Sequence, residues 1–188
     1  MDPAGLERLL CRARRREPAA LQRLVELFAP RVFGLLYRLT GSREIAEELL
    51  QETFLRLVRT IGDYEHSGRF QAWLFRIATN LVRDHARRQR RRQPTLPLDD
   101  AQRDGLARLA VSQTGPAEEL QRRESRQRVN AALDALGALD REIILLRHFA
   151  GLSFREIAAL LEIPLGTALA RAHRALKRLR DLLGDQEA

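Results

Sequence analysis

Arginine is the residue type in this chain that is best suited to binding a polyanion. The 188 residues include 33 Lys or Arg against 25 Asp or Glu, a formal net charge of +8, and Lys177 is the single lysine. Arginine makes up six of the ten residues 83–92, and five of the ten residues 171–180 are basic. A planar guanidinium forms paired hydrogen bonds with phosphate and base edges. The clustering favours a nucleic-acid partner, whereas the preference for arginine over lysine is also what a GC-rich genome produces.

Residues 153–180 have the pattern of a helix–turn–helix. Ser153 and Glu156 form an S-x-x-E capping box, which begins a helix, and after a tight turn a second helix runs from about Thr167 to Leu183. The apolar positions predicted to bury this second helix are Ala168, Ala172, Leu176, Leu179 and Leu183. Three arginines recur on the opposite face: Arg171, Arg174 and Arg178. Such a helix fits the major groove of DNA; the alternative is a helical hairpin with a solvated basic face.

Residues 62–92 combine a polar loop, aromatic side chains and arginine. Helical spacing begins at Phe70 and continues through Asn80 into the arginine cluster. Aromatic rings beside a basic surface can stack on unpaired bases, and the loop Gly62–Arg69 could form part of a pocket for an extruded base. The alternative for Phe70, Trp73 and Phe75 is a place in the core.

An acidic and amide face lies on the helix predicted from Ile45 to Ile61. Its members are Glu47, Glu48, Gln51 and Glu52. Carboxylates repel phosphate, so this face is either solvated or binds a protein.

Catalytic and metal-binding chemistry finds no support in the sequence. The four histidines, His66, His85, His148 and His173, form no pair at metal-ligand spacing, and no glycine-rich phosphate loop occurs. Cys11 is the one cysteine, which excludes an internal disulfide, and we expect it to be a buried small residue. We therefore expect no enzyme activity, no cofactor and no metal.

The elements that position these residues are predicted to be helices, because no window shows sustained apolar alternation. Two helical runs flank Pro30, Ser42 is the predicted N-cap of the helix that follows, and Asp140 that of a later helix. The longest stretch without a charged residue is nine residues, so we expect no membrane span and a cytoplasmic protein.

Residues 93–117 contain Pro94, Pro97, Gly105, Gly115 and Pro116 and predict a flexible linker, with a short helix near residues 106–111. We therefore expect an all-α fold of two helical domains, residues 1–92 and 118–188.

The sequence resembles a known family in both halves. Residues 46–55 (AEELLQETFL), residues 70–80 (FQAWLFRIATN), Asp84 and Arg87-Arg88 are similar to region 2 of the extracytoplasmic-function sigma factors of the sigma-70 family. Residues 136–142 (LGALDRE), 151–158 (GLSFREIA) and 163–167 (IPLGT) resemble region 4 of the same proteins. Many helix–turn–helix regulators share the region 4 pattern, but the two patterns in this order span almost the whole chain.

The resemblance implies a bacterial transcription initiation factor that binds core RNA polymerase, on its β and β′ subunits, and directs it to promoters. Region 2 would be a helical bundle and region 4 a helix–turn–helix bundle, and the linker would enter the polymerase cleft. The family commonly uses a further partner, an anti-sigma protein, which is often a membrane protein. No membrane insertion of this chain itself is implied.

The resemblance also implies roles for individual residues. Docking on core polymerase would use Glu47, Glu48, Gln51, Glu52 and Leu55. Melting and reading the minus-ten element, with one base flipped into the loop, would use Asp63, Tyr64, Arg69, Phe70, Trp73, Arg76, Asn80, Arg83, Arg87 and Arg88. Reading the minus-thirty-five element as duplex would use Ser153, Arg155, Thr167, Arg171, His173, Arg174, Lys177 and Arg178.

Other functions stay open at this level. A stand-alone helix–turn–helix repressor or activator would bind an operator as a dimer through residues 1–90, although a dimerisation domain has no need of the Asn80 helix with its arginine tail. An RNA-binding or antitermination protein would use the same basic patches on RNA. A hydrolase or transferase has the least support, because no constellation of titratable groups suggests one.

The residues after Gly166-Thr167 depart from the family pattern. The family usually has a valine, a basic or polar residue and a small polar residue before an arginine, whereas this chain has Ala168-Leu169-Ala170-Arg171. Neither Leu169 nor Ala170 can donate a hydrogen bond to a base, although both can contact the methyl group of thymine.

We therefore predict that recognition of the minus-thirty-five element is weakened or altered, with Arg171, His173 and Arg174 making the remaining contacts. Each missing bidentate base contact removes about 1–3 kcal/mol of discrimination, so changing the guanines of an ordinary guanine-rich element should alter promoter affinity only slightly. A promoter-binding assay in which binding depends fully on those guanines would contradict the prediction.

Overall fold

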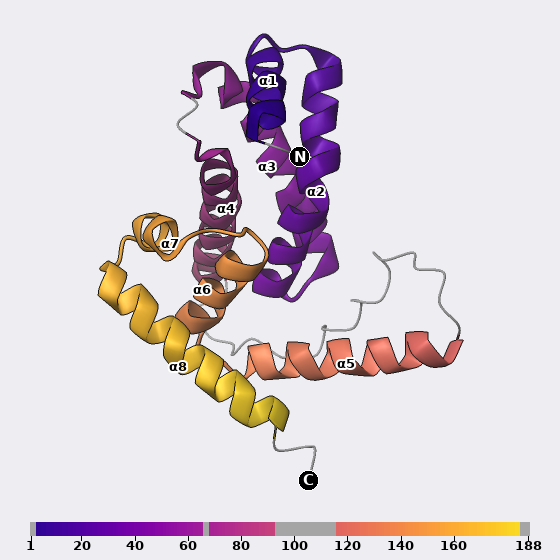
Figure 1. Ribbon diagram of the computed structural model, residues 1–188, viewed down its shortest axis with the longest axis vertical. Coiled ribbons are helices and arrows are strands. Elements are labelled where there is room, and N and C mark those ends of the chain that lie inside the picture. The colour runs from indigo at the N-terminus through magenta and orange to yellow at the C-terminus, as the bar shows by residue number, and fades with distance from the viewer. Residues whose placement is uncertain (1–2, 66–67, 93–115, 185–188) are drawn as a thin grey trace. The chain divides into compact units, whose positions relative to one another are not determined.

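The computed structural model describes residues 3–65, 68–92 and 116–184 of the chain. Every regular element in these ranges is a helix, so the all-α prediction is confirmed for them (Figure 1). The chain divides into two compact units, residues 1–102 and 103–188. Most of the predicted linker, including the short helix expected near residues 106–111, lies outside the described residues. No helix in the described ranges combines the length and the apolar character needed to cross a bilayer.

The first unit is an up-and-down arrangement of four helices. These are α1 (Pro3–Arg14), α2 (Pro18–Thr40), α3 (Arg43–Thr60) and α4 (Phe70–Arg92), with the short 3-10 helix η1 (Ile61–Asp63) after α3. Helix α2 packs against α1, α3 and α4, and η1 packs against α1. Successive helices reverse direction, so the α1–α2 corner and the α3–α4 connection lie at the same end of the bundle (Figure 1).

The core of this unit comes from apolar residues that recur every three or four positions. Its buried members include Leu24, Phe28, Val32 and Leu35 of α2, Leu49, Phe54 and Leu57 of α3, and Phe70, Leu74, Phe75, Ala78 and Leu81 of α4. Full burial of a leucine or phenylalanine side chain stabilises a fold by about 1.5–3 kcal/mol. Burial of these apolar residues therefore determines which face of each helix is left for solvent or a partner.

Helix α2 is continuous through Pro30, where the sequence indicates two separate helical runs. Proline removes one backbone N–H and with it one helical hydrogen bond. The buried residues Leu24, Phe28 and Val32 bind both halves of the helix to the same core, which offsets that loss. The helix ends at Gly41, which adopts a left-handed φ of 70° and donates its N–H to the carbonyl of Tyr37.

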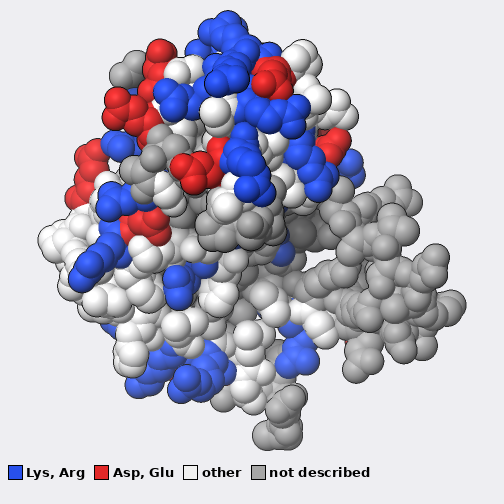
Figure 2. Space-filling view, turned by 45° about the horizontal axis from the view of Figure 1, so that its top comes forward, with Lys and Arg blue, Asp and Glu red and all other residues white. Residues whose placement is uncertain are grey.

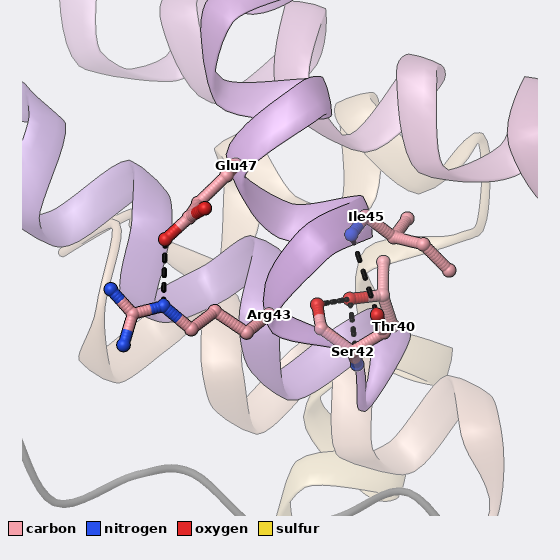
Figure 3. A network of polar contacts seen from close by, with 5 residues as sticks. All are labelled: Thr40, Ser42, Arg43, Ile45 and Glu47. Atoms are coloured by element: carbon pink, nitrogen blue, oxygen red, sulfur yellow. Dashed lines mark hydrogen bonds and ion pairs between the residues drawn. The ribbon is translucent and has the colours of Figure 1, made fainter.

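Ser42 caps α3, as the sequence predicts (Figure 3). Its hydroxyl oxygen accepts a hydrogen bond from the Ile45 N–H at 3.3 Å. The Thr40 hydroxyl donates to the Ser42 carbonyl at 3.2 Å, and Arg43 Nε donates to Glu47 at 2.7 Å. These contacts join the end of α2 to the start of α3. They also fix the first turn of α3, the helix that carries the acidic and amide face.

The second unit contains α5 (Pro116–Asp134), α6 (Ala138–His148), α7 (Phe154–Leu161) and α8 (Leu165–Gly184). Helix α8 packs against the other three. Its buried residues are alanines, Ala168, Ala172 and Ala175, which face the leucines and isoleucines of α6 and α7. Small side chains on α8 let the neighbouring helices approach its backbone closely.

Two predictions about this unit are wrong. Asp140 does not cap α6, because that helix begins at Ala138 with Gly137 as its N-cap. The carboxylate of Asp140 lies in the first turn and accepts a hydrogen bond from Arg171 instead. Leu176 is 44% exposed, because the row of alanines turns Ala175 to the core in its place.

The prediction for Cys11 is also wrong, since its side chain is exposed. The buried face of α1 is formed by Leu9, Leu10 and Ala13, and Cys11 points away from it. Position 11 is one residue past Leu10, or about 100° around the helix, which places it outside the buried stripe.

Helix α7 has the predicted capping box. The Ser153 N–H donates to the Glu156 carboxylate at 2.8 Å, and the Glu156 N–H donates to the Ser153 hydroxyl at 3.3 Å. At the other end, Glu162 occupies the turn into α8 with a left-handed backbone, φ 57° and ψ 41°. A residue with a Cβ is strained in this conformation, which favours glycine.

We predict that Glu162→Gly stabilises the second unit, because glycine adopts the left-handed region without the clash of a Cβ. The expected gain in the free energy of unfolding is about 0.5–1 kcal/mol, after allowance for the greater freedom of glycine in the unfolded chain. Urea unfolding of the purified protein measures it. Glu162→Ala is the control, since it removes the charge and keeps the Cβ; an equal gain in both variants would refute the backbone explanation.

Candidate nucleic-acid interface

Helix α4 carries a row of polar and basic side chains opposite its buried face. The row consists of Trp73, Arg76, Asn80, Arg83 and Arg87, which follow one another at steps of three or four residues and so share one side of the helix. Arg76, Asn80, Arg83 and Arg87 are exposed, and Trp73 is half-buried. An amide and several guanidinium groups are therefore lined up on a rigid element, where each can reach bases or phosphates of the same strand.

An aromatic cluster supports the first turn of α4. The ring centroids of Tyr64 and Trp73 are 4.6 Å apart, those of Tyr64 and Phe70 are 5.7 Å apart, and Phe28 meets Phe70 edge-on at 5.3 Å. Phe70 is 1% and Tyr64 8% exposed, and burial raises the pKa of the Tyr64 phenol. Of the predicted aromatic contacts to DNA, Trp73 alone reaches the surface in this structure, and Tyr64 and Phe70 lie beneath it.

The segment that joins α3 to α4 holds two further predicted contacts. Asp63 ends η1 and Arg69 precedes α4, and both side chains are exposed. Residues 66 and 67, in the middle of the loop predicted to receive a flipped base, lie outside the described residues. The described parts of the loop place a carboxylate and a guanidinium on its two sides.

The arginines after Asp84 are exposed but differ in their partners. Arg87 forms an ion pair with the Asp84 carboxylate, and Arg88 Nε donates to the Asp84 carbonyl at 3.3 Å. Arg83 belongs to the same surface, one residue before the carboxylate. This end of the described surface is basic, with one carboxylate that orients the side chain of Arg87.

The acidic and amide face lies on α3, as predicted. Glu47, Glu48, Gln51 and Leu55 are exposed, and Glu52 is half-buried. Glu47 pairs with Arg43 at 2.7 Å and Glu52 with Arg56 at 2.8 Å, each within the helix. Leu55 is 51% exposed, more than any other large hydrophobic residue of the described ranges. This face therefore presents carboxylates and an amide, with one exposed apolar side chain at its C-terminal end.

The exposed face of α8 carries most of the basic side chains predicted to read duplex DNA. His173, Arg174, Lys177 and Arg178 are exposed, and Thr167 is half-buried. On α7, Arg155 is exposed, whereas the Ser153 backbone and hydroxyl are both bonded to Glu156. This arrangement presents the middle of α8 as the basic surface of the helix–turn–helix.

Arg171 differs from the other predicted contacts because it is bound within the protein. Its guanidinium donates to the Asp140 carboxylate at 2.9 Å, and the two side chains are 34% and 22% exposed. The pair ties α8 to the first turn of α6. An arginine held in this way is less able to turn toward a base than the freely exposed Arg174.

Two side chains outside the predicted contacts lie on the surface at the start of α8. Leu169 is 45% exposed and Leu165, one turn earlier, is 38% exposed. Together they give this end of the helix an apolar edge. Spacing of four residues is the sequence signal that could have joined Leu165 to Leu169, whereas no local signal pairs Asp140 with Arg171, 31 residues away.

Comparison with protein families finds matches in both units. Residues 24–92 match the family Sigma-70 region 2, and residues 126–179 match Sigma-70, region 4. The first match contains α3 and α4, and the second contains the helix–turn–helix.

Several curated proteins are similar over most of this chain. The RNA polymerase sigma factor CarQ of Myxococcus xanthus is 39% identical over 168 residues, which are 89% of this chain and 91% of that protein. The ECF RNA polymerase sigma factor SigW of Bacillus subtilis is 31% identical, covering 86% and 88% of the two chains. The ECF RNA polymerase sigma factor SigE of Mycolicibacterium smegmatis is 39% identical over 85% of this chain, but this chain spans only 60% of its length.

Solved structures share the fold. The sigma factor RpoE of Bartonella quintana, in complex with the anti-sigma factor NepR, superposes with a TM-score of 0.69 at 24% identity, covering 88% of this chain and 97% of that one. CnrH, in complex with the cytosolic domain of CnrY, gives a TM-score of 0.66 at 24% identity, covering 95% and 96%.

We predict that Arg171 and Asp140 act on stability as a pair. Asp140→Ala and Arg171→Ala should each lower the free energy of unfolding by about 1–2 kcal/mol, because each leaves a half-buried charged group without its partner. Solvent screens the pair, so the double variant should recover about 0.5–1 kcal/mol relative to the sum of the single effects. Denaturant unfolding of the four proteins measures the cycle.

Arg174→Ala is the control for this cycle. Its side chain is exposed, so we expect unchanged stability and weaker binding of duplex DNA. Purely additive losses for Asp140 and Arg171 would show that the ion pair contributes nothing.

Proposed function

Since this chain belongs to the extracytoplasmic-function sigma factors of the sigma-70 family, we propose that its two units divide the work of transcription initiation between them. It is an initiation factor of bacterial RNA polymerase with a region 2 and a region 4. The boundaries that we propose are residues 1–92 for region 2, 93–117 for the linker and 118–188 for region 4.

Region 2 binds the melted minus-ten element through α4. Strand separation exposes base faces and leaves the phosphates of one strand accessible, which suits a row of arginines interrupted by an amide and an indole. Trp73, Arg76 and Asn80 contact bases or sugars, and Arg83, Arg87 and Arg88 hold phosphate. Tyr64 and Phe70 are buried and act indirectly, because their rings hold Trp73 in position.

Region 2 also docks on core polymerase, through the acidic and amide face of α3. Glu48, Gln51 and Leu55 are fully available, whereas Glu47 and Glu52 have to share or exchange their intrahelical arginine partners. The carboxylates suit a basic surface on the polymerase, and Leu55 supplies apolar contact at the C-terminal end of the patch.

Region 4 reads the minus-thirty-five element as duplex, with α8 in the major groove. Arg174, Lys177, Arg178 and His173 lie on its exposed face. Leu165 and Leu169 offer apolar contact at the start of the helix, where hydrogen-bond donors are more usual. Arg155 and Ser153 lie at the start of α7, where they contact the phosphate backbone of the same DNA element.

This function requires no catalytic group or cofactor in the chain, and we infer that the protein is not itself an enzyme. It acts in the cytoplasm, where bacterial polymerase and promoter DNA are. An anti-sigma protein is a further partner, as it is of the RpoE structure from Bartonella quintana. The stand-alone regulator is less well supported, since it leaves the region 2 match and the α4 row without a use.

The observation that carries the proposal is the presence, on one bundle, of a basic reading face on α4 and an acidic docking face on α3. A factor that binds DNA alone needs the first face and not the second.

We predict that the purified protein binds bacterial core RNA polymerase stoichiometrically and that Glu48→Ala/Gln51→Ala/Glu52→Ala abolishes this binding. The variant removes exposed or half-buried side chains of α3 and leaves its buried face intact, so the fold should persist. A pull-down with core polymerase measures the binding, and circular dichroism verifies the helices.

Gln22→Ala/Glu26→Ala is the matched control, because it removes an exposed amide and carboxylate from α2 of the same bundle. It should bind core like the wild type. If neither the wild type nor the control binds core, and the protein alone binds duplex DNA sequence-specifically, the chain is a stand-alone regulator.

A further inference from the structure

The corner between α1 and α2 presents consecutive arginines that none of the surfaces described above includes. We propose that Arg14, Arg15 and Arg16 bind the phosphate backbone of promoter DNA that flanks the minus-ten element. This inference rests on the proposed function, because it requires the first unit to be on that element.

The corner is a defined turn. The N–H groups of Arg15 and Arg16 donate to the carbonyls of Arg12 and Ala13 at 3.1 and 2.8 Å, and Glu17 N–H donates to Arg12 at 3.3 Å. Arg12 Nε also binds the Glu17 carboxylate at 2.7 Å. The backbone and one ion pair therefore hold the turn closed, and the three arginines after Ala13 take no part in that ion pair.

Arg16 occupies a position where glycine would be more stable. Its φ is 59°, in the left-handed region at the end of α1, where a Cβ is strained. The arginine side chain thus stands at a site whose backbone does not favour it. Arg16→Gly therefore removes the positive charge and also relieves the backbone strain. A loss of binding in this variant could not be attributed to a less stable fold.

The corner is a concentrated positive surface. Arg14, Arg15 and Arg16 are all exposed. Figure 2, in which this end of the first unit is turned forward, shows Lys and Arg side chains gathered over its upper part with a few carboxylates among them. Guanidinium groups in such number favour a ligand with repeated negative charges.

The topology of the bundle places this surface next to the proposed reading site. Helix α1 packs against η1, which begins the segment that leads to α4. The α1–α2 corner and the α3–α4 connection lie at the same end of the bundle (Figure 1). The arginine tail of α4 lies toward the opposite end, since α4 runs away from that connection. DNA bound along α4 and continuing past Arg69 would therefore leave the bundle at the end that carries the corner (Figure 1).

An acidic protein is the other class of ligand for such a surface. The described residues of the connection include the exposed carboxylates Asp63 and Glu65 as well as Arg69. A uniformly acidic protein surface would be repelled by these two carboxylates. Asp63 and Glu65 repel phosphate as well, but the phosphates of a strand are separate points of charge, so single phosphates can lie against the arginines and not against the carboxylates.

The test compares two variants that each remove two positive charges. Arg15→Gln/Arg16→Gly alters the corner. Arg8→Gln/Arg23→Gln is the control, because it removes two exposed arginines of the same bundle that lie outside both the corner and the docking face. Each is assembled with core polymerase, and binding to a promoter fragment selected by the wild-type holoenzyme is measured between 50 and 200 mM salt, roughly the range over which phosphate contacts are released.

We expect the corner variant to lose about two phosphate contacts. The slope of log affinity against log salt should fall by about 1.8, and affinity at moderate salt by about tenfold or more. The melting temperature should be unchanged or higher, and core binding unchanged. The defect should disappear on a fragment trimmed to the minus-ten element. The control variant should show a smaller change in slope than the corner variant.

Three outcomes would overturn the inference. An unchanged affinity and slope would show that the corner does not touch DNA. Loss of core binding by the corner variant would assign the arginines to the polymerase. An equal defect on the trimmed fragment would mean that flanking DNA is not the ligand. Failure of the wild type to bind core is a separate result, which overturns the proposed function itself.

Discussion

Burial of one face of α4 is the interaction on which the first unit depends. Phe70, Leu74 and Phe75 enter a core shared with α2 and α3, and the same burial leaves Arg76 and Asn80 outside. No further interaction is needed to orient the polar side chains of α4, because the side chains of a helix keep a constant angular relation to one another. Phe70 contacts Phe28, Tyr64 and Trp73 together, so the hydrophobic core and the surface that we propose to meet DNA are parts of one packing arrangement.

The second unit reaches a similar result with smaller side chains. Ala168, Ala172 and Ala175 bring α8 close to its neighbours, and leucines flank that row. Close approach gives many dispersion contacts, but it buries little area on α8 itself. The ion pair between Arg171 and Asp140 adds a directional contact between α8 and α6. The orientation of α8 thus depends on one polar contact as well as on packing.

The sequence predicted the helical class, the Ser42 cap, the Ser153 capping box and the polar faces of α3 and α4, because all of these depend on residues three or four positions apart. It was wrong about Asp140, Leu176 and Cys11, whose environments are decided by helix rotation and by a partner distant in sequence. It also could not show that Tyr64 and Phe70 lie beneath Trp73, since an aromatic residue next to a polar loop is compatible with either place. The sequence contains the run Arg14-Arg15-Arg16, but only the topology puts it at the same end of the bundle as the connection from α3 to α4 (Figure 1).

The bond between Arg171 and Asp140 has a consequence for how such a protein diverges. With α8 as the proposed reading helix, promoter preference would change most readily at side chains that have no structural role, which on α8 are exposed positions such as Leu169, Ala170, His173 and Arg174. Arg171 is not free in this sense, because any replacement must also suit the carboxylate on α6. Substitutions that change DNA preference are therefore expected mainly on the other side of the helix. Positions 140 and 171 are expected to be inherited together or replaced together.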